Sequence, residues 1–399
     1  MLNVGFIKIY HIVCKLVKPS FINNFMRGFD SLNFSLCLAK IIPSWIEFKR
    51  KILVQIRSSQ NMLSGKKVLI TGGTGSLGQA LTERLLKTDV ETIRIFSRNE
   101  NKQVIMEDKI RDKRLRFLIG DVRDKDRLVT ALEDIDIVFH AAALKHVPVI
   151  EYNPFESIKT NVIGSQNVID ACLHQNVETA ICIGTDKAVS PLNTYGATKL
   201  LMEKLFVTAN NYLNRKKHRT KFVAVRYGNV VGSSGSVIPK FIEQIQAKKK
   251  ITITDPKMTR FSITMDQALD LIVDAALDGR ESEIYVPKLK SYLITDVKEA
   301  LFELLGNTGE EVVGIRSGEK LHEVLINKDE IRYSWNLGNR YMIANPLRDE
   351  NEIKKSYSNK ISKIEDMETY SSDNVEKISK DELKKTIIES GLLNVKSQY

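Results

Sequence analysis

The feature that most constrains this chain is a set of glycines between an apolar segment and an amphipathic one, in "KVLITGGTGSLGQALTERLL", residues 67–86. Gly72, Gly75 and Gly78 are three positions apart. After a strand, the first glycine permits a tight turn, the second lets the backbone approach a pyrophosphate, and the third allows close helix–strand packing. The segment therefore predicts a dinucleotide cradle. Further contacts are expected from the residues between the glycines, Thr74, Ser76 and Leu77.

Short β-rich runs alternate with amphipathic stretches from Lys66 to Gly228. The runs are "KVLIT", "TIRIFS", "LRFLIGD", "IDIVFHAA", "TAICIGT" and "FVAVRYG". Helices are expected from Leu77, Asn161 and Tyr195. This alternation implies right-handed crossovers, and it predicts an α/β domain with a doubly wound parallel (Rossmann) sheet.

Past Gly228 the alternation becomes irregular, with helices expected from Pro239, Asp266 and Lys380, and a polar loop or linker around 349–363. This region predicts a smaller C-terminal substrate-binding lobe over the carboxyl edge of the sheet, where such folds bind ligands. The predicted division is a non-catalytic N-terminal extension at 1–61, an NADP-binding Rossmann domain at 62–228, and a mainly substrate-binding lobe at 229–399. Segments of the last part can return to the sheet.

The formal charge of +11 is concentrated in the first 61 residues, where nine Lys and Arg face Asp30 and Glu47, a balance of +7. The rest carries +4 and no basic stripe interleaved with aromatics, which argues against nucleic-acid binding. No apolar run in the extension reaches the roughly 18 residues of a membrane helix. The extension is interpreted as an upstream start, with Met62 as the working one, or as a basic membrane-surface or partner-binding segment.

The cysteines Cys14, Cys37, Cys172 and Cys182 show neither metal-ligand spacing nor the density of a disulfide framework. No metal site is expected. Cys172 and Cys182 lie in apolar segments, where a reduced thiol packs as a small hydrophobe. These features predict a soluble protein of a reducing cytoplasm.

At the end of the second predicted strand, Ser97 and Arg98 stand where an NAD-selective site usually has a carboxylate, with Lys102 one turn further on. A hydroxyl and a guanidinium suit a 2′-phosphate, so NADP is favoured over NAD. The other predicted contacts are Asp121 and Val122 at the adenine, and Ala142 and Ala143 along the ribose. Lys145 and His146 are either ligand contacts or rim residues.

The fifteen residues "TDKAVSPLNTYGATK", 185–199, contain two chemical pairs. Tyr195 and Lys199 are four apart at a helix start, so both can face a nicotinamide ribose. A free tyrosine, with a pKa of about 10, is a poor base at neutral pH. An adjacent ammonium and the nicotinamide ring would favour its phenolate, which can then take a proton from a sugar hydroxyl.

With these residues, the chain resembles the extended short-chain dehydrogenase/reductase superfamily, whose members act mostly on nucleotide sugars. Thr185 matches the superfamily's Ser/Thr, which would bind the same sugar hydroxyl. A 4-epimerase needs no second acid/base pair, but a 4,6-dehydratase must remove the proton at carbon 5 and protonate the leaving hydroxyl at carbon 6. Lys187 as the base and Asp186 as the acid fit that requirement.

Within the superfamily, the chain looks most like the inverting UDP-N-acetylglucosamine 4,6-dehydratases of pseudaminic acid synthesis. The strings that carry this resemblance are "SRNENKQ", "AAALKHVPVIEYNPFESIKTNV", "VRYGNVVGSSGSVIPKF", "TDPKMTRF" and "GIRSGEKLHEVLI". The resemblance implies a UDP-N-acetylglucosamine substrate, an L-arabino 4-keto-6-deoxy product, and a homo-oligomer, either a dimer or a hexamer. It also implies that Asn229 lies by the diphosphate and that UDP is held by Arg260, Arg316 and Glu319, with Lys145 as a further substrate contact.

Four positions depart from that family's pattern: Gly184, Ser234, Ser317 and Asp373. Ser234 stands where an arginine is usual, which leaves either weaker diphosphate binding or a different substrate open. Related enzymes with 5-epimerase activity have Met where Tyr195 stands, so Tyr195 argues against them. A retaining 4,6-dehydratase, a UDP-sugar epimerase and a silent NADP-binding regulator remain as alternatives. The regulator is disfavoured because Lys187, Tyr195 and Lys199 are all present.

Overall fold

The computed structural model describes residues 62–232, 236–315 and 318–394. The N-terminal extension, Ser234, Arg316 and Ser317 lie outside the described residues. None of the helices in the described ranges combines the length and apolarity that crossing a membrane requires.

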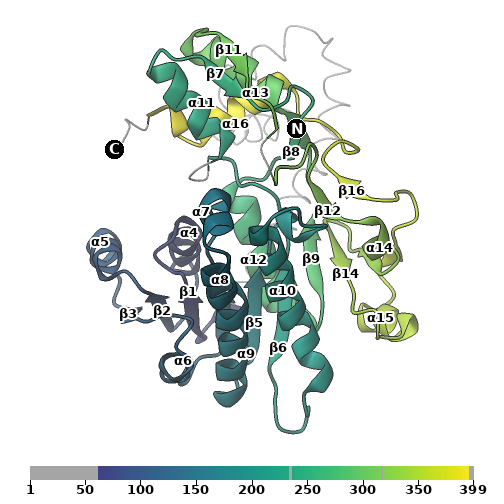
Figure 1. Ribbon diagram of the computed structural model, residues 1–399. Helices are drawn as coiled ribbons and strands as arrows, with labels where there is room; N and C mark the ends of the chain where they lie inside the picture. Colours follow the sequence, from purple (N-terminus) through teal and green to yellow (C-terminus); the bar gives the residue numbers. More distant parts are fainter. Residues whose placement is uncertain (1–61, 233–235, 316–317, 395–399) are drawn as a thin grey trace, which may run out of the picture. The chain divides into compact units, whose positions relative to one another are not determined.

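One large sheet forms the centre of the fold. Its strands are β1 (Lys67–Thr71), β2 (Thr92–Ser97), β3 (Leu115–Ile119), β4 (Ile137–His140), β5 (Thr179–Ile183), β6 (Lys221–Val225), β9 (Ile284–Pro287), β13 (Ser334–Asn336), β14 (Arg340–Ile343) and β15 (Ser362–Lys363). They form a ten-stranded sheet in the order β15-β13-β14-β9-β6-β5-β4-β1-β2-β3 (Figure 1). The strands from β3 to β9 are mutually parallel.

Helices cover both faces of the parallel strands. The helices of this part are α4 (Ser76–Leu85), α5 (Glu100–Ile110), α6 (Lys125–Ala131), α7 (Val147–Tyr152), α8 (Pro154–Ser157), α9 (Gly164–His174), α10 (Thr194–Ala209) and α12 (Met265–Asp278), with the π-helical turn η2 (Ile158–Ile163) and the 3-10 turns η3 (Asp186–Ala188) and η4 (Asn210–Tyr212). α6, α9 and α10 pack side by side over one face, and α4 contacts α12 on the other (Figure 1). Because both faces are covered, the central strands are almost wholly buried. The doubly wound prediction is confirmed.

A second hydrophobic cluster lies beyond the carboxyl edge of the sheet. Its elements are α11 (Val237–Gln246), β7 (Ile251–Ile253), β8 (Thr259–Phe261), β10 (Ser291–Leu293), α13 (Ile294–Leu305), β11 (Glu310–Val312), α16 (Lys380–Glu389) and the 3-10 turn η5 (Leu392–Asn394). Phe241, Val297 and Leu383 are among the buried residues that join α11, α13 and α16. Figure 1 shows these helices grouped around β7 and β11. This group is the smaller lobe.

The C-terminal part is divided between the lobe and the sheet. β9 extends the parallel strands, and β14, β13 and β15 then add antiparallel strands. Three further elements complete the chain: β12 (Val324–Ile326), α14 (Lys328–Ile331) and β16 (Tyr370–Ser371). β12 pairs with β16 next to the cleft described below. The domain boundary at Gly228 stays a prediction.

The prediction of a loop or linker around 349–363 is wrong. This stretch forms α15 (Glu350–Ser356) and ends in β15. Asp349 caps the helix by accepting from the backbone N–H groups of Asn351 and Glu352. Ile353 is the one buried side chain on α15. Because only one side chain of α15 is buried, the sequence of this helix has too little hydrophobic periodicity to predict it.

Candidate active site

Two glycines of the cradle, Gly72 and Gly78, lie too close to neighbouring backbone to carry a side chain. Gly72 has a φ of +68°, and a Cβ there would lie 2.9 Å from the Cα of Ala142. A Cβ on Gly78 would lie 2.5 Å from the backbone of Gly73, where α4 packs on the turn. Ala142 donates its N–H to the Thr71 hydroxyl at 3.2 Å, which fixes the ends of β1 and β4 together.

The amino end of α4 opens toward the cleft. Its N-cap is Gly75, which supplies no side-chain cap, so the first N–H groups of the helix are left for a ligand. Ser76 and Leu77 line the cleft, whereas Thr74 is buried. The space above α4 therefore fits a dinucleotide diphosphate, both in shape and in electrostatic sign.

The predicted adenosine contacts lie at the ends of β2 and β3. The Ser97 hydroxyl is buried and accepts from the Gln103 amide at 3.0 Å. Arg98 is exposed, with a nitrogen 3.8 Å from the Asp121 carboxylate. Partial burial of Asp121 works against ionisation, but hydrogen bonds from Arg123 outweigh it and lower the pKa of that carboxyl. The remaining predicted contacts in this region are Lys102, which is exposed, and Val122, which is buried.

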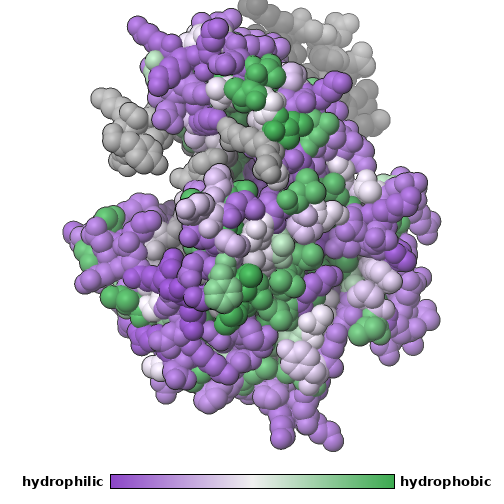
Figure 2. All heavy atoms as spheres, viewed as in Figure 1, coloured by the Kyte–Doolittle hydropathy of each residue, from purple (hydrophilic) through white to green (hydrophobic). Residues whose placement is uncertain are grey.

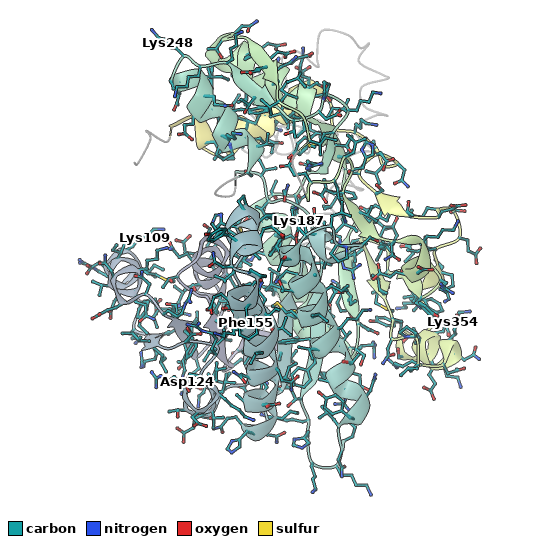
Figure 3. The ribbon with its side chains drawn as sticks, viewed as in Figure 1. Lys109, Asp124, Phe155, Lys187, Lys248 and Lys354 are labelled. Carbon is teal, nitrogen blue, oxygen red and sulfur yellow. The ribbon has the colours of Figure 1, made fainter. Side chains whose placement is uncertain are left out.

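The reacting pairs lie at the carboxyl edge of the sheet, where η3 follows β5. Lys187 donates its Nζ to Asp186 Oδ1 and to Asn229 Oδ1, each at 3.0 Å. The Thr185 hydroxyl also donates to Asp186 Oδ1, at 2.8 Å. Figure 3 shows Lys187 at the end of the sheet that adjoins the smaller lobe. Residues from two strand ends therefore form one hydrogen-bonded group.

The pKa values of the two lysines of this region are shifted in opposite directions. Burial lowers the pKa of Lys199, whose Nζ donates to the Ile183 carbonyl at 2.5 Å. Burial also opposes the charge on Lys187, but Asp186 and Glu323 outweigh it and raise the pKa of Lys187 above its ordinary range. Lys187 therefore holds its proton in this structure, although it is the residue predicted to act as a base.

Tyr195, the second residue of α10, lies beside this group. Burial raises the pKa of its hydroxyl, while Lys187 and a hydrogen bond with Thr185 act in the opposite direction. From the sequence, Lys199 is the ammonium expected to favour the phenolate of Tyr195. In this structure, Lys187 is the cation that lowers the pKa of Tyr195.

A cavity of about 820 Å³ brings most of the predicted reacting and substrate residues together. Lining residues that were predicted from the sequence are Ser76, Leu77, Ala143, Lys145, Thr185, Lys187, Tyr195, Lys199, Asn229, Arg260 and Glu319. Asp186 is fully buried and does not itself line the cavity. The Arg98 and Asp121 end of the site lies outside the cavity, and Arg316 lies outside the described residues.

The predicted UDP contacts occupy different surroundings. One terminal nitrogen of Arg260 donates to the Thr259 and Leu321 carbonyls, at 2.7 and 3.1 Å. Its Nε lies 3.6 Å from Glu323 Oε1. Asn229 touches Lys187. Its expected place by the diphosphate stays a prediction.

Lys320 and Glu323 are among the charged residues of this cavity that sequence reasoning missed. Both lie in "GEKLHEVLI", a string that carries part of the family resemblance but no motif of its own. Lys320 donates to the Val189 carbonyl, and burial lowers its pKa. Two charges in a short segment far from the glycine cradle are a weak pattern, and only the fold places them beside Lys187.

The chain is similar to several known proteins. The family model described as "Polysaccharide biosynthesis protein" matches residues 68–345. A Campylobacter jejuni relative named UDP-N-acetylglucosamine 4,6-dehydratase (inverting) is 45% identical over 319 residues, 78% of this chain and 94% of the relative. A Rickettsia felis relative named UDP-glucose 4-epimerase is 41% identical over 332 residues, 82% of this chain and 96% of the relative.

Solved structures agree with the fold. The X-ray structure of Pen from Bacillus thuringiensis is 39% identical, with a TM-score of 0.76, and the match covers 83% of this chain and 99% of that one. The dTDP-glucose 4,6-dehydratase DesIV from Streptomyces venezuelae is 20% identical, with a TM-score of 0.59, over 73% of this chain and 96% of that one. At that identity, the second likeness concerns the fold alone.

Proposed function

Because the chain belongs to the polysaccharide biosynthesis protein family, we propose that it is an inverting UDP-N-acetylglucosamine 4,6-dehydratase, a lyase. The observation that carries this proposal is the Asp186–Lys187 pair, hydrogen-bonded at 3.0 Å, whose lysine lines the same cavity as Tyr195. The named function of the Campylobacter jejuni relative supports it. The proposed product is UDP-2-acetamido-2,6-dideoxy-β-L-arabino-hex-4-ulose, formed in the first step of a pseudaminic acid-type synthesis.

The cradle fits a nicotinamide dinucleotide, because Cβ atoms at Gly72 and Gly78 would collide with backbone where the turn must stay thin. We assign NADP, with the 2′-phosphate on Arg98 and Lys102. A bound dinucleotide would supply hydride transfer, from sugar carbon 4 in the oxidation and back to carbon 6 in the reduction. Asp121, Val122, Ala142 and Ala143 would follow the adenosine and ribose.

Tyr195 would take the proton from the carbon 4 hydroxyl, with Thr185 holding that hydroxyl in place. The raised pKa of Tyr195 means that its phenolate needs help at neutral pH. Lys187 is the cation that supplies part of that help in this structure. The Lys199 side chain, fixed on the Ile183 carbonyl, would hold the nicotinamide ribose.

Lys187 and Asp186 would carry out the elimination. A proton moving along their 3.0 Å hydrogen bond converts the ammonium–carboxylate pair into an amine and a carboxylic acid. The amine can then take the carbon 5 proton, while the acid's proton leaves with the carbon 6 hydroxyl as water. Asp186 is fully buried. Its proton must therefore travel through one of its hydrogen-bond partners, Thr185 or Lys187.

A UDP-sugar 4-epimerase is the second candidate, because the Rickettsia felis relative bears such a name at 41% identity. An epimerase uses Tyr195 and the dinucleotide but has no task for an acid/base pair beside them. A retaining dehydratase would use the same residues and differ only in the face on which carbon 5 is reprotonated.

Proton NMR of UDP-N-acetylglucosamine with the Met62-start protein in deuterated buffer separates these functions. A carbon 6 methyl signal with deuterium at carbon 5 and L-arabino couplings is expected. A methyl signal with the original configuration would indicate the retaining enzyme. If UDP-N-acetylgalactosamine were the only product, the epimerase would replace our proposal.

We also propose that the protein works in the cytoplasm as a homo-oligomer. Apolar side chains are exposed on one face of α7, α8 and α10, where Figure 2 shows an apolar area. They include Val149, Phe155 and Leu201, which are 61%, 60% and 50% exposed. Light scattering of the wild type and of Phe155→Glu tests this: a monomeric wild type would refute it, and dissociation of the variant is expected.

A further inference from the structure

Glu323 is a buried carboxylate whose backbone is held firmly beside the cavity. It immediately precedes β12 and is 3% exposed. Its N–H donates to the Ser372 hydroxyl at 2.9 Å, and its carbonyl accepts from the Ser372 N–H at 2.8 Å. These bonds tie residue 323 to the segment that follows β16, so the position of its carboxylate is set by the fold.

One oxygen of this carboxylate lies between two cations. Glu323 Oε1 is 3.6 Å from Lys187 Nζ and 3.6 Å from Arg260 Nε. The other oxygen, Oε2, is buried and has no hydrogen-bond partner among the described residues. Leaving a carboxylate oxygen without a donor is costly in a protein interior. Such a cost suggests a functional reason for this residue.

Lys187 lies between two carboxylates. Asp186 holds it from the side of the sheet, and Glu323 holds it from β12. The ionisable groups that act on it or that it acts on are Asp186, Tyr195, Arg260, Tyr292, Lys320 and Glu323. Of these, Asp186 and Glu323 raise the pKa of Lys187 most, while Arg260 lowers it.

We propose that Glu323 is a positioning residue for the elimination step: its carboxylate holds the Lys187 ammonium at the cavity wall, with Arg260 as the second cation on the same oxygen. The role in elimination rests on the proposed dehydratase function. The electrostatic link between Glu323 and Lys187 does not, because it is a property of the side chains themselves. Glu323 opposes proton transfer from Lys187 to Asp186, and so it sets the pH at which Lys187 becomes a base.

The direct test measures the proton affinity of Lys187 in the holoenzyme without turnover. An amine-reactive reagent labels only the neutral amine, so the labelling rate at one pH, followed by mass spectrometry, reports the pKa. One pKa unit corresponds to a tenfold change in rate. In Glu323→Gln, we expect Lys187 to be labelled about tenfold faster or more, because an opposite charge at this distance typically shifts a pKa by one unit or more.

Three variants keep the result interpretable. Asp373→Asn changes a carboxylate that accepts from Ser371 in the same segment but does not line the cavity, and it should label at the wild-type rate. Glu323→Asp keeps the charge and should stay within a few-fold of wild type. In Arg260→Gln, Lys187 should be labelled more slowly, since Arg260 lowers the pKa of Lys187. This variant gives a test of opposite sign if Glu323→Gln does not fold.

Unchanged labelling in Glu323→Gln, or equal acceleration in Glu323→Asp, would overturn the proposal. The pH profile of carbon 5 deuterium exchange then addresses the catalytic role. Its midpoint should move to lower pH in Glu323→Gln, whereas a purely structural defect would lower the rate without moving the midpoint. A wild type with no exchange at any pH would refute the dehydratase function while leaving the labelling result valid.

Discussion

The two halves of the cleft are built in different ways. We assign the dinucleotide half mainly to one continuous stretch, from β1 to the residues that follow β4. The substrate half combines η3 with the residues after β6, with β8 and with the segment before β12, which are far apart in the chain. The first half is a backbone surface kept thin by glycines, and the second is a cluster of charged side chains. We therefore expect backbone shape to control dinucleotide binding and charge balance to control the chemistry.

The largest expected effect is in the substrate half. Lys187→Ala removes the proposed base of the elimination, so formation of the methyl product should fall by about 10²–10⁴-fold. Bound NADP should be retained, because Lys187 contacts Asp186 and Asn229 rather than the cradle. Product NMR and dinucleotide content by absorbance measure the two effects. Loss of the dinucleotide would show that the halves are not separable.

Tyr195→Phe tests the boundary between the halves. The rate of the first oxidation should fall by roughly 10²–10⁴-fold, because the variant lacks the phenol hydroxyl that we propose takes the carbon 4 proton. In the wild type, the raised pKa of Tyr195 predicts that this oxidation becomes faster as pH rises toward that pKa. Stopped-flow absorbance of the reduced dinucleotide measures both. A variant with full oxidation activity would contradict the role of Tyr195.

Gly72→Ala should affect the dinucleotide half alone. The new Cβ would lie 2.9 Å from Ala142 at a φ of +68°, a cost of about 1–3 kcal/mol to the free energy of unfolding. Gly75→Ala is the matched control, since its φ is −74° and its nearest contact is 3.2 Å. Thermal unfolding without dinucleotide should show a lower Tm for Gly72→Ala only. Equal Tm losses would show that the turn is not the strained element.

Arg98→Ala should have the smallest effect, on dinucleotide choice. Losing a charge-assisted hydrogen bond to a 2′-phosphate costs about 1.5–3 kcal/mol, so the preference for NADP over NAD should fall by about tenfold or more. Calorimetric titration with each dinucleotide measures it. Lys109→Ala is the control, because Lys109 pairs with Glu83 away from the site. A wild type that prefers NAD would refute the NADP assignment.

The same contrast explains what could be predicted from the sequence. The strands and the glycine turn were predictable because each rests on local periodicity or on backbone conformation at particular residues, such as Gly72. The helix starts at α4, α10 and α11 were placed within a few residues of those observed. Tyr195 and Lys187 were identified because both lie within fifteen residues that follow one strand.

Contacts between distant segments were not predictable in this way. The link between Glu323 and Lys187 is visible only in the fold, where β12 contacts η3. The two residues are 136 positions apart in the chain, and no periodicity of the sequence predicts their contact. The same holds for the electrostatic state of Lys187, which depends on charges from β8 and β12 as well as from its neighbour Asp186. Burial and ion pairing, rather than residue type, decide the direction in which the pKa of each lysine shifts.

The position of β9 in the chain affects how the sheet forms while the protein is being synthesised on the ribosome. β6 ends at Val225, but its partner β9 begins only at Ile284, after α11, β7, β8 and α12 have been made. At roughly 5–20 residues per second, β6 waits for several seconds as an apolar edge strand with unpaired backbone groups. Such an edge can pair with another nascent chain. Early chaperone contact with this half-built sheet should therefore matter more for yield than the stability of the finished protein.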